Sequence, residues 1–201
     1  MPDLSLEKEL QAQGYSLICG VDEAGRGPLC GPVVAAACIL PPDYDIPELN
    51  DSKKLTPKKR EKLFEIVKEQ AIAYAVASAT PEEIDALNIL NADMLAMRRA
   101  IEALSPAADF ALIDGNVVRN IPIPAKAVVK GDAISASIAA ASILAKVTRD
   151  RICEEDDASY PQYGIKKHKG YPTKDHMDAV RKYGPSPIHR RSFLKFLNED
   201  T

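Results

Sequence analysis

The sequence has few cysteines and no long apolar run. These two features argue against a zinc or redox protein and against a membrane-spanning protein. The four cysteines of the 201-residue chain show no CxxC spacing and no nearby histidine partner, which argues against a zinc or redox site. The longest apolar stretch, 137–145, is far shorter than the roughly 20 residues that cross a bilayer. The first ten residues are charged and contain no apolar region of the kind a signal peptide needs. We therefore expect a cytoplasmic protein without a membrane span.

The chain also lacks a large net charge. Its formal charge is −3 at pH 7, which excludes a uniformly basic nucleic-acid-binding protein. The charges are unevenly distributed, however, because residues 160–195 contain nine Lys or Arg, two Asp and all three histidines. A local basic face of this kind can bind a polyanion whatever the net charge of the whole chain.

The pattern of apolar runs predicts an α/β fold. Apolar residues make up 46% of the chain, enough for the core of one large domain. Strands are expected over 16–21, 32–40, 71–79, 110–113 and 127–129. Helices are expected to begin after Thr56 and Thr80, to cover 134–155, and to run from Thr173 to Gly184. The first two strands are joined by a short turn and should be antiparallel. We expect a mixed β-sheet flanked by helices over 1–159, with a C-terminal helical extension over 160–201.

Four acidic residues follow runs that we expect to be strands. Asp22 and Glu23 follow the first strand, Asp114 follows the fourth, and Asp132 comes just after the fifth. Ligands of open α/β sheets bind at the carboxyl ends of the strands, so these carboxylates converge if the three strands are neighbours. Their mutual repulsion would be relieved by Mg²⁺ or Mn²⁺, the hard cations that carboxylates bind. Two such ions about 4 Å apart are the usual arrangement for displacement at phosphorus.

The alternative for the acids is a set of solvated turn residues, since Asp-Gly and Gly-Asp are common turn dipeptides. That alternative is favoured for any one of the four acids taken alone. The metal site is favoured for the set, because three apolar runs end in the same way.

The glycines that follow the first acids form no dinucleotide site. Gly25-Arg26-Gly27 lacks the G-x-G-x-x-G spacing and leads into another strand instead of a helix, which argues against a Rossmann pyrophosphate site. Glycines here would let the backbone approach a ligand closely, or would simply form a β-turn.

Basic residues in three segments suit a phosphate backbone, and one segment adds a ring that can stack on a base or a sugar. The predicted substrate contacts are Lys53, Lys54, His168, Lys169, Tyr171, Arg190 and Arg191.

Taken in series, these motifs resemble the ribonuclease HII family, the bacterial type 2 ribonucleases H. The matching segments occur in order, at residues 21–28, 51–55, 112–116, 129–132, 140–150, 168–173 and 189–193. The resemblance implies an RNase H-like fold and a metal-dependent endoribonuclease that hydrolyses the RNA strand of RNA–DNA hybrids. It also implies incision of duplex DNA on the 5′ side of single embedded ribonucleotides, with Mg²⁺ or Mn²⁺ as cofactor.

The resemblance also assigns roles to individual residues. The family's metal-binding carboxylates fall on Asp22, Glu23, Asp114 and Asp132. The element that reads the ribose 2′-OH, largely through backbone contacts, falls on Gly25, Arg26 and Gly27, and the residue that packs on the sugar beyond the scissile phosphate falls on Tyr171. The 2′-OH is the group that distinguishes RNA from DNA at a given site. No motif for a sliding clamp is evident after Phe196, so that partner stays open, and a monomer is the default expectation.

Two other functions fit parts of the pattern. A nucleic-acid-binding protein with an inactive site would carry the basic residues, but the complete set of four acids argues against it. A junction resolvase with an RNase H-like fold would carry the acids, but Gly25-Arg26-Gly27 and Tyr171 argue against it.

Overall fold

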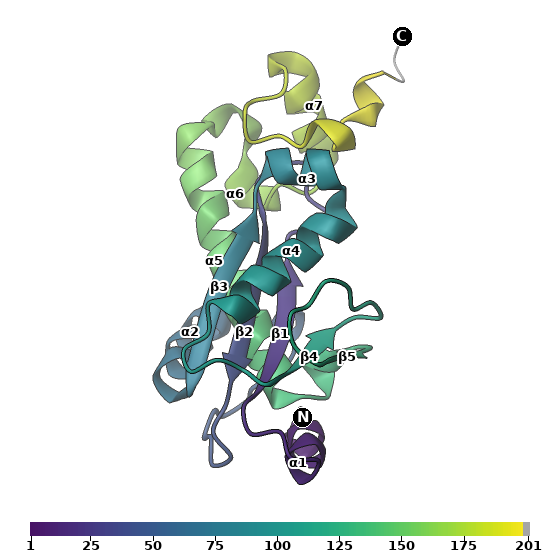
Figure 1. The fold of residues 1–201 in the computed structure, drawn as a ribbon. Coiled ribbons are helices and arrows are strands. Elements are labelled where there is room, and N and C mark those ends of the chain that lie inside the picture. The colour runs from purple at the N-terminus through teal and green to yellow at the C-terminus, as the bar shows by residue number, and fades with distance from the viewer. Residues whose placement is uncertain (199–201) are drawn as a thin grey trace.

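A five-stranded mixed sheet forms the centre of the computed structural model, which describes residues 1–198 (Figure 1). The strand order is β3-β2-β1-β4-β5, with β1 antiparallel to β2, β2 antiparallel to β3, and β4 parallel to both β1 and β5. The strands are β1 (Ile18–Ala24), β2 (Val33–Ile39), β3 (Ala73–Ala79), β4 (Phe110–Asp114) and β5 (Ala125–Val128). The predicted mixed sheet and its antiparallel first pair are confirmed.

Helices cover both faces of this sheet. Helix α5 packs on β1 and β2 from one side, and α4 packs on β3, β2 and β1 from the other, each over its own apolar cluster. Figure 1 places α1 at one end of the molecule and α7 at the opposite end. The α-helices of the described chain are α1 (Ser5–Ala12), α2 (Pro57–Gln70), α3 (Pro81–Leu87), α4 (Ile89–Glu102), α5 (Ala136–Ser159), α6 (Ile165–His168) and α7 (Lys174–Tyr183).

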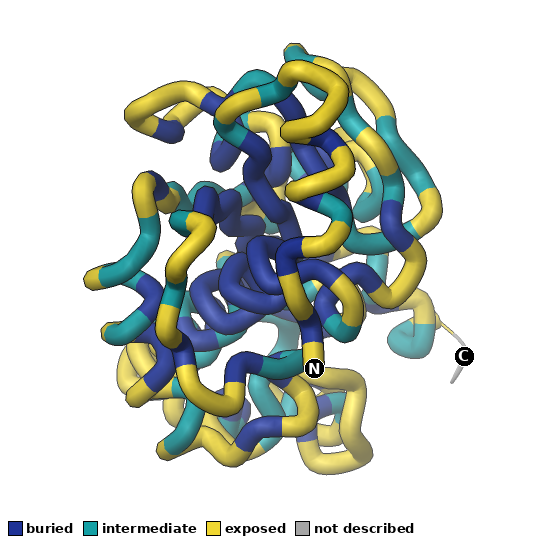
Figure 2. The backbone as a smooth tube through the Cα atoms, turned by 90° about the horizontal axis from the view of Figure 1, so that it is seen from below, coloured by how far each residue is buried: buried dark blue, intermediate teal, exposed yellow. Residues whose placement is uncertain are grey.

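Helix α5 lies directly on β1 because β1 has no side chain at Gly20. A Cβ at Gly20 would lie 2.1 Å from the backbone nitrogen of Ile138, so any other residue would push the helix off the sheet. The facing half of α5, 136–145, is mostly apolar and is buried throughout, as its composition predicts. Figure 2 shows the buried segments at the centre of the molecule, with exposed loops around them. The first turns of α5 therefore have a fixed position beside the end of β1.

The predicted helix starts are confirmed by their caps. The Thr56 hydroxyl accepts a hydrogen bond from the backbone N–H of Lys59, and Thr80 forms a capping box with Glu83. Helix α7 begins after Thr173 and ends before Gly184, as expected. A side-chain cap of this kind contributes about 1 kcal/mol, so the capping residues are a dependable guide to where helices begin.

Several boundaries differ from the prediction. Strand β1 continues to Ala24, so Asp22 and Glu23 lie inside the strand instead of past its end. Strand β5 begins at Ala125 and ends at Val128, and α5 is capped by Ser135 and runs on to Ser159. Helix α1 was not predicted. No helix within residues 1–198 is long and apolar enough to cross a membrane.

The segment after α5 has a small apolar core of its own. Its helices α6 and α7 surround a cluster that also includes Leu29 and Cys30 from the β1–β2 loop and Cys153 from α5. The buried part of this cluster is Leu29, Cys30, Cys153, Tyr163, Ile165, Val180 and Leu194. The predicted division between 159 and 160 coincides with the end of α5 and stays a prediction. The last three residues of the predicted C-terminal extension, 199–201, lie outside the described residues.

Candidate active site

Three of the predicted carboxylates meet where β1 and β4 end. Val21 and Ile113 are partners in the parallel ladder, so the next pair along these strands is Asp22 and Asp114. Side chains alternate along a strand, which sends Asp22 and Asp114 to one face and Glu23 to the other. One carboxylate oxygen from each of these three acids lies within 4.8 Å of the other two. The convergence predicted from the sequence is therefore present for these three residues.

The fourth predicted acid stands beside this group but outside its 4.8 Å limit. Asp132 lies in a 3₁₀ turn, Gly131–Ala133, that follows β5. The backbone N–H of Gly131 donates to Asp114 Oδ1 at 2.6 Å and ties that turn to β4. The charges of Asp51 and Asp114 both act on Asp132, so four predicted acids and one further acid, Asp51, share this end of the sheet.

Burial and mutual repulsion raise the pKa values of these acids. Asp22 is 4% exposed, and its pKa is raised by burial first and then by the charges of Glu23 and Asp114. Burial also raises the pKa of Glu23. Burial, Asp51 and Asp114 together raise the pKa of Asp132 to about 6. A crowded set of oxygen donors whose charges repel one another fits Mg²⁺ or Mn²⁺, because a divalent cation compensates all of the charges at once.

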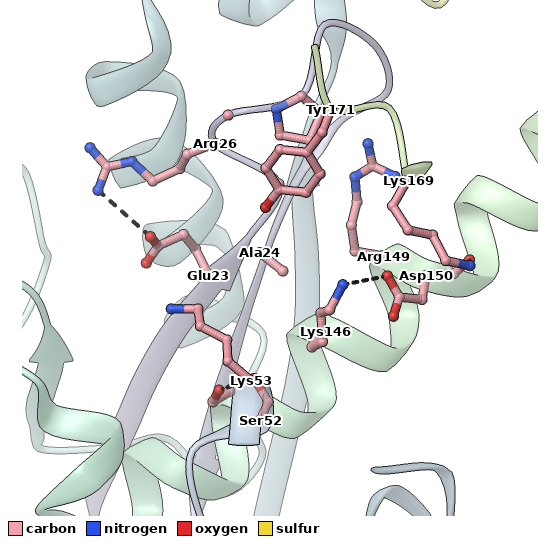
Figure 3. A pocket seen from close by; sticks show the side chains of 14 residues that line it. Glu23, Ala24, Arg26, Ser52, Lys53, Lys146, Arg149, Asp150, Lys169 and Tyr171 are labelled. Atoms are coloured by element: carbon pink, nitrogen blue, oxygen red, sulfur yellow. Dashed lines mark hydrogen bonds and ion pairs between the residues drawn. The ribbon is translucent and has the colours of Figure 1, made fainter. Parts of the chain in front are cut away.

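A positively charged side chain beside these acids is that of Lys53, which lies in the 3₁₀ turn Ser52–Lys54. Partial burial lowers the pKa of Lys53, but the charges of Asp22 and Asp132 outweigh that effect and raise it. The turn is fixed by Asp51, whose Oδ1 accepts from the Lys53 backbone N–H at 2.8 Å, and by a 2.7 Å bond between the hydroxyls of Ser142 and Ser52. Lys53 points toward Glu23 in Figure 3, whereas the side chain of Lys54 is 60% exposed and lies near Asp51.

A cleft of about 370 Å³ opens beside the acids (Figure 3). The Gly25-Arg26-Gly27 loop forms one wall, and the ring of Tyr171 lies over that loop. A Cβ at Gly27 would come within 3.2 Å of Tyr171 Cε1, so the glycine leaves room for the ring. The remaining lining residues include four basic side chains and the acids Glu23 and Asp150. The lining includes Lys53, Lys146, Arg149, Lys169 and Tyr171. An acidic floor beside a basic cleft with an exposed ring is suited to a phosphodiester substrate.

Comparison with known proteins assigns the family. The family model described as ribonuclease HII matches residues 19–196. A curated ribonuclease HII from Desulfitobacterium hafniense is 61% identical over 187 residues, which cover 93% of this chain and 72% of the relative. The chain belongs to the ribonuclease HII family. It is accordingly a metal-dependent hydrolase that cleaves the RNA strand of RNA–DNA hybrids.

Solved structures agree with this assignment. The crystal structure of ribonuclease H2 from Pyrococcus horikoshii is similar with a TM-score of 0.75 and 30% identity, covering 92% of this chain and 98% of that one. The ribonuclease HII of Archaeoglobus fulgidus, solved in a complex with PCNA, has a TM-score of 0.72 and 25% identity, covering 88% of this chain and 94% of that one. The RNase H-like fold predicted from the sequence is confirmed.

Two buried histidines fix the backbone that carries Tyr171. The backbone N–H of Ser186 donates to Nδ1 of His189 at 3.1 Å, so the ring proton of His189 is on Nε2. That nitrogen lies 3.2 Å from Nε2 of His176, whose Nδ1–H donates to the Tyr171 carbonyl at 3.0 Å. Burial lowers the pKa of both rings, to about 4 for His189. Both histidines are therefore neutral at pH 7, and their tautomers are set by backbone groups.

The same pair lies close to Cys30, and the three residues have the spacing of a metal site. One ligand atom from each of Cys30, His176 and His189 lies within 4.8 Å of the other two. A metal on Nε2 of His189 would require the proton to be on Nδ1, which instead accepts from the Ser186 N–H. Burial also raises the pKa of the Cys30 thiol to about 12, far from the thiolate that a metal needs. The two histidines are a hydrogen-bonded support for the Tyr171 loop.

Two of the predicted substrate contacts are wrong as direct contacts. Arg190 is completely buried, and its guanidinium donates only to backbone carbonyls, so it cannot reach a phosphate. Both ring nitrogens of His168 are also engaged, one with the Tyr163 carbonyl at 2.9 Å and one with the Gly170 N–H at 3.2 Å. These side chains shape the loops of the cleft from behind. In contrast, Lys169 lines the cleft, and the Arg191 side chain is exposed.

Sequence reasoning missed one buried acid near the site. Asp93 is 1% exposed on α4, and its Oδ2 lies 3.5 Å from Nε of Arg26. Burial and the charge of Glu23 raise its pKa to about 8. Arg26 also contacts Glu23, at 3.6 Å, and thus lies between a predicted metal ligand and a buried acid. The available signal was an aspartate on the apolar face of a helix whose other buried residues are alanine, methionine and isoleucine.

Proposed function

We propose that this ribonuclease HII incises duplex DNA on the 5′ side of single embedded ribonucleotides, with two divalent ions held by Asp22, Glu23, Asp114 and Asp132. The observation that carries the proposal is the combination of three carboxylates within 4.8 Å and an adjoining cleft walled by Gly25, Arg26 and Gly27. The first feature serves hydrolysis at phosphorus, and the second offers backbone groups to a 2′-OH.

The acids and Lys53 organise the reacting end of the cleft. When bound, Mg²⁺ or Mn²⁺ supplies the Lewis acidity for hydrolysis at the scissile phosphate and compensates the repulsion among the carboxylates. The carboxylates hold fixed positions because β1, β4 and the turn after β5 are locked in one sheet. Lys53, charged at neutral pH beside Asp22 and Asp132, is placed to bind a phosphate oxygen.

The opposite wall of the cleft would recognise the ribonucleotide. Tyr171 presents an exposed ring over Gly27, so a sugar beyond the scissile phosphate can pack on it. We assign phosphate contacts outside the reacting centre to Lys54, Lys169 and Arg191. In this proposal the C-terminal extension, 160–198, serves substrate binding, because it carries Tyr171 and Lys169.

We further propose that the protein acts as a monomer in the cytoplasm. All four cysteines are free and buried, as a reducing compartment maintains them. A sliding clamp stays a possible partner, because the A. fulgidus ribonuclease HII was solved with PCNA. Size-exclusion chromatography with light scattering, with and without a clamp protein, tests both expectations.

The deciding experiment uses an end-labelled DNA duplex that contains one ribonucleotide, an otherwise identical all-DNA duplex, and a long RNA–DNA hybrid. We expect one Mg²⁺-dependent nick 5′ to the ribonucleotide, no cut in the all-DNA duplex and no product in EDTA. Cleavage of the hybrid without a nick at the single ribonucleotide would contradict the proposed specificity. A nick in EDTA would contradict the metal mechanism.

A further inference from the structure

Arg190 is a buried cation whose side-chain hydrogen bonds, within residues 1–198, all go to backbone carbonyls, with the ring of Phe193 5.2 Å from its guanidinium carbon. Its side chain is completely excluded from solvent, and no carboxylate of the described chain forms an ion pair with it. Nε donates to the Gly31 carbonyl at 2.9 Å, Nη1 to those of Arg26 and Pro28 at 3.0 and 2.8 Å, and Nη2 to that of Gly25 at 2.6 Å. All four acceptors belong to the loop between β1 and β2. Burying a charged guanidinium costs free energy, and these four hydrogen bonds to one loop offset part of that cost.

These bonds determine which way the loop's amides point. In a planar trans peptide the C=O and the following N–H point in opposite directions. Because the carbonyls of Gly25 and Arg26 face Arg190, the N–H groups of Arg26 and Gly27 face away from it. Pro28 provides an internal check: its carbonyl also faces Arg190, and the next N–H, that of Leu29, points away and donates to the Gly170 carbonyl at 2.8 Å.

The two amides that Arg190 turns outward are available to a ligand. Within residues 1–198 neither the Arg26 N–H nor the Gly27 N–H donates to any protein group, and both residues line the cleft. Successive free N–H groups of this kind form a concave site for an electronegative atom. A substrate bound in the cleft beside the ring of Tyr171 can supply such an atom.

We propose that Arg190 is a positioning residue that sets the preference of the enzyme for a ribonucleotide, by aiming the Arg26 and Gly27 amides at the 2′ oxygen. The inference rests on the proposed function. It adds that the loop conformation responsible for selectivity is held by Arg190, a residue more than 160 positions later in the chain that bonds the side of the loop facing away from the cleft. Arg190 itself touches neither substrate nor metal.

Two other roles for Arg190 predict different results. As a phosphate contact, it would strengthen binding to any duplex equally, because phosphates carry no information about the sugar. As a purely structural anchor, its replacement would lower stability, and the surviving folded protein would keep its preference for the ribonucleotide. Only the positioning role predicts that the preference itself is lost.

The test measures affinity in a cleavage-deficient background, Asp132→Asn, so that binding is separated from hydrolysis. Fluorescence anisotropy in Mg²⁺ gives Kd for a duplex with one ribonucleotide and for the matched all-DNA duplex. Arg190→Lys keeps the charge but cannot serve four carbonyls at once. We expect the ratio of the two Kd values to fall about tenfold, the loss of two neutral hydrogen bonds, with Kd for the all-DNA duplex nearly unchanged.

Controls separate this inference from the proposed function. Arg99→Lys changes an arginine that bonds Glu83 and the Ser78 carbonyl, and it should leave the ratio unchanged. Denaturant unfolding shows whether each variant is folded. The ratio of the two Kd values is also measured for Arg190→Gln. An unchanged ratio in folded Arg190→Lys, or an equal weakening on both duplexes, would overturn the inference. If the wild-type protein makes no nick at a single ribonucleotide, it is the proposed function that fails.

Discussion

The two sides of the cleft are built in opposite ways. On the acidic side, the strands β1 and β4 force carboxylates together, and burial and mutual repulsion raise the pKa values of Asp22, Glu23 and Asp132 despite the nearby Arg26 and Lys53. On the side of Tyr171, the polar groups of the supporting residues are matched: the rings of His176 and His189 and the guanidinium of Arg190 all have hydrogen-bond partners in the chain.

This difference follows from what each side has to do. A site for divalent cations must keep its charges ready for an absent partner, which costs stability until the cation arrives. A site that reads one hydroxyl group must hold its backbone in a single conformation, which requires many bonds per residue. Substitutions on the acidic side should therefore remove activity and spare the fold, whereas substitutions behind the Tyr171 loop should affect both.

The largest effect is expected for Asp132→Asn. The substitution removes one of the four acids, and cleavage of both the long hybrid and the single-ribonucleotide duplex should fall by about a thousandfold or more. Single-turnover rates on both substrates provide the measurement. Asp43→Asn, on an exposed loop, is the matched control and should be as active as the wild type. A variant that retained more than a tenth of the activity would remove Asp132 from the site.

The next effect concerns stability in acid, on the other side of the cleft. The pKa of His189 is about 4 in the folded protein, against about 6.5 when unfolded. Between these values the unfolded chain binds a proton that the folded protein does not. The contribution of His189 to stability is therefore complete above pH 6.5 and is lost as the pH falls toward 4, by up to about 3 kcal/mol.

Denaturant unfolding at pH 7.5, 6 and 5 measures this dependence. His189→Gln, whose amide can still donate toward His176, has no titrating ring and should lose less stability than the wild type over that range. Parallel slopes for the two proteins would show that His189 does not titrate in the unfolding transition. The raised pKa values of the cleft acids act with the opposite sign, and they cancel in the difference between the two proteins.

A smaller effect is expected for the ring that lies over Gly27. Tyr171→Ala removes a stacking surface and should raise Kd for the single-ribonucleotide duplex by about ten- to a hundredfold. Tyr171→Phe keeps the ring and should remain close to the wild type. Equal losses for the two variants would assign the effect to the hydroxyl instead of the ring.

The smallest effect is a shift in melting temperature with metal. At a Mg²⁺ concentration several times its Kd, binding adds about 1 kcal/mol and should raise the wild-type Tm by about 2–4 °C relative to EDTA. Asp114→Asn should shift much less, because it lacks one of the four proposed ligands. Equal shifts in the two proteins would place the bound Mg²⁺ elsewhere.

The acidic side could be predicted from the sequence because local patterns encode it. Apolar runs end at Asp114 and shortly before Asp132, and the position of these runs in an α/β pattern favours a shared sheet edge, although the parallel β4 and β5 are joined by a loop without a helix. The sequence did not reveal that β1 continues through Glu23. An acidic residue at the end of a strand can keep its backbone hydrogen bonds in the sheet, so its side chain does not mark where the strand ends.

The recognition side was predicted less well. An arginine in a basic cluster is most simply interpreted as a phosphate contact, and its burial depends on carbonyls of the 25–31 loop, far away in the sequence. Asp93 was missed for a similar reason, because it reaches Arg26 only once α4 packs on the sheet. Helix α1 was missed because it is short, although its Glu7 accepts a 2.6 Å hydrogen bond from the hydroxyl of Ser135, the N-cap of α5.

The measurement that tests the account most directly pairs two properties of one variant, Asp22→Asn. Asp22 is buried beside two other acids, so a neutral amide there should lower the nicking rate on the single-ribonucleotide duplex to background. In EDTA the same substitution should leave the free energy of unfolding unchanged or raise it, because a repelling buried charge is gone. Full activity, or a loss of stability as large as the several kcal/mol typical of a disrupted core, would contradict the claim that this acid is present for metal-dependent chemistry.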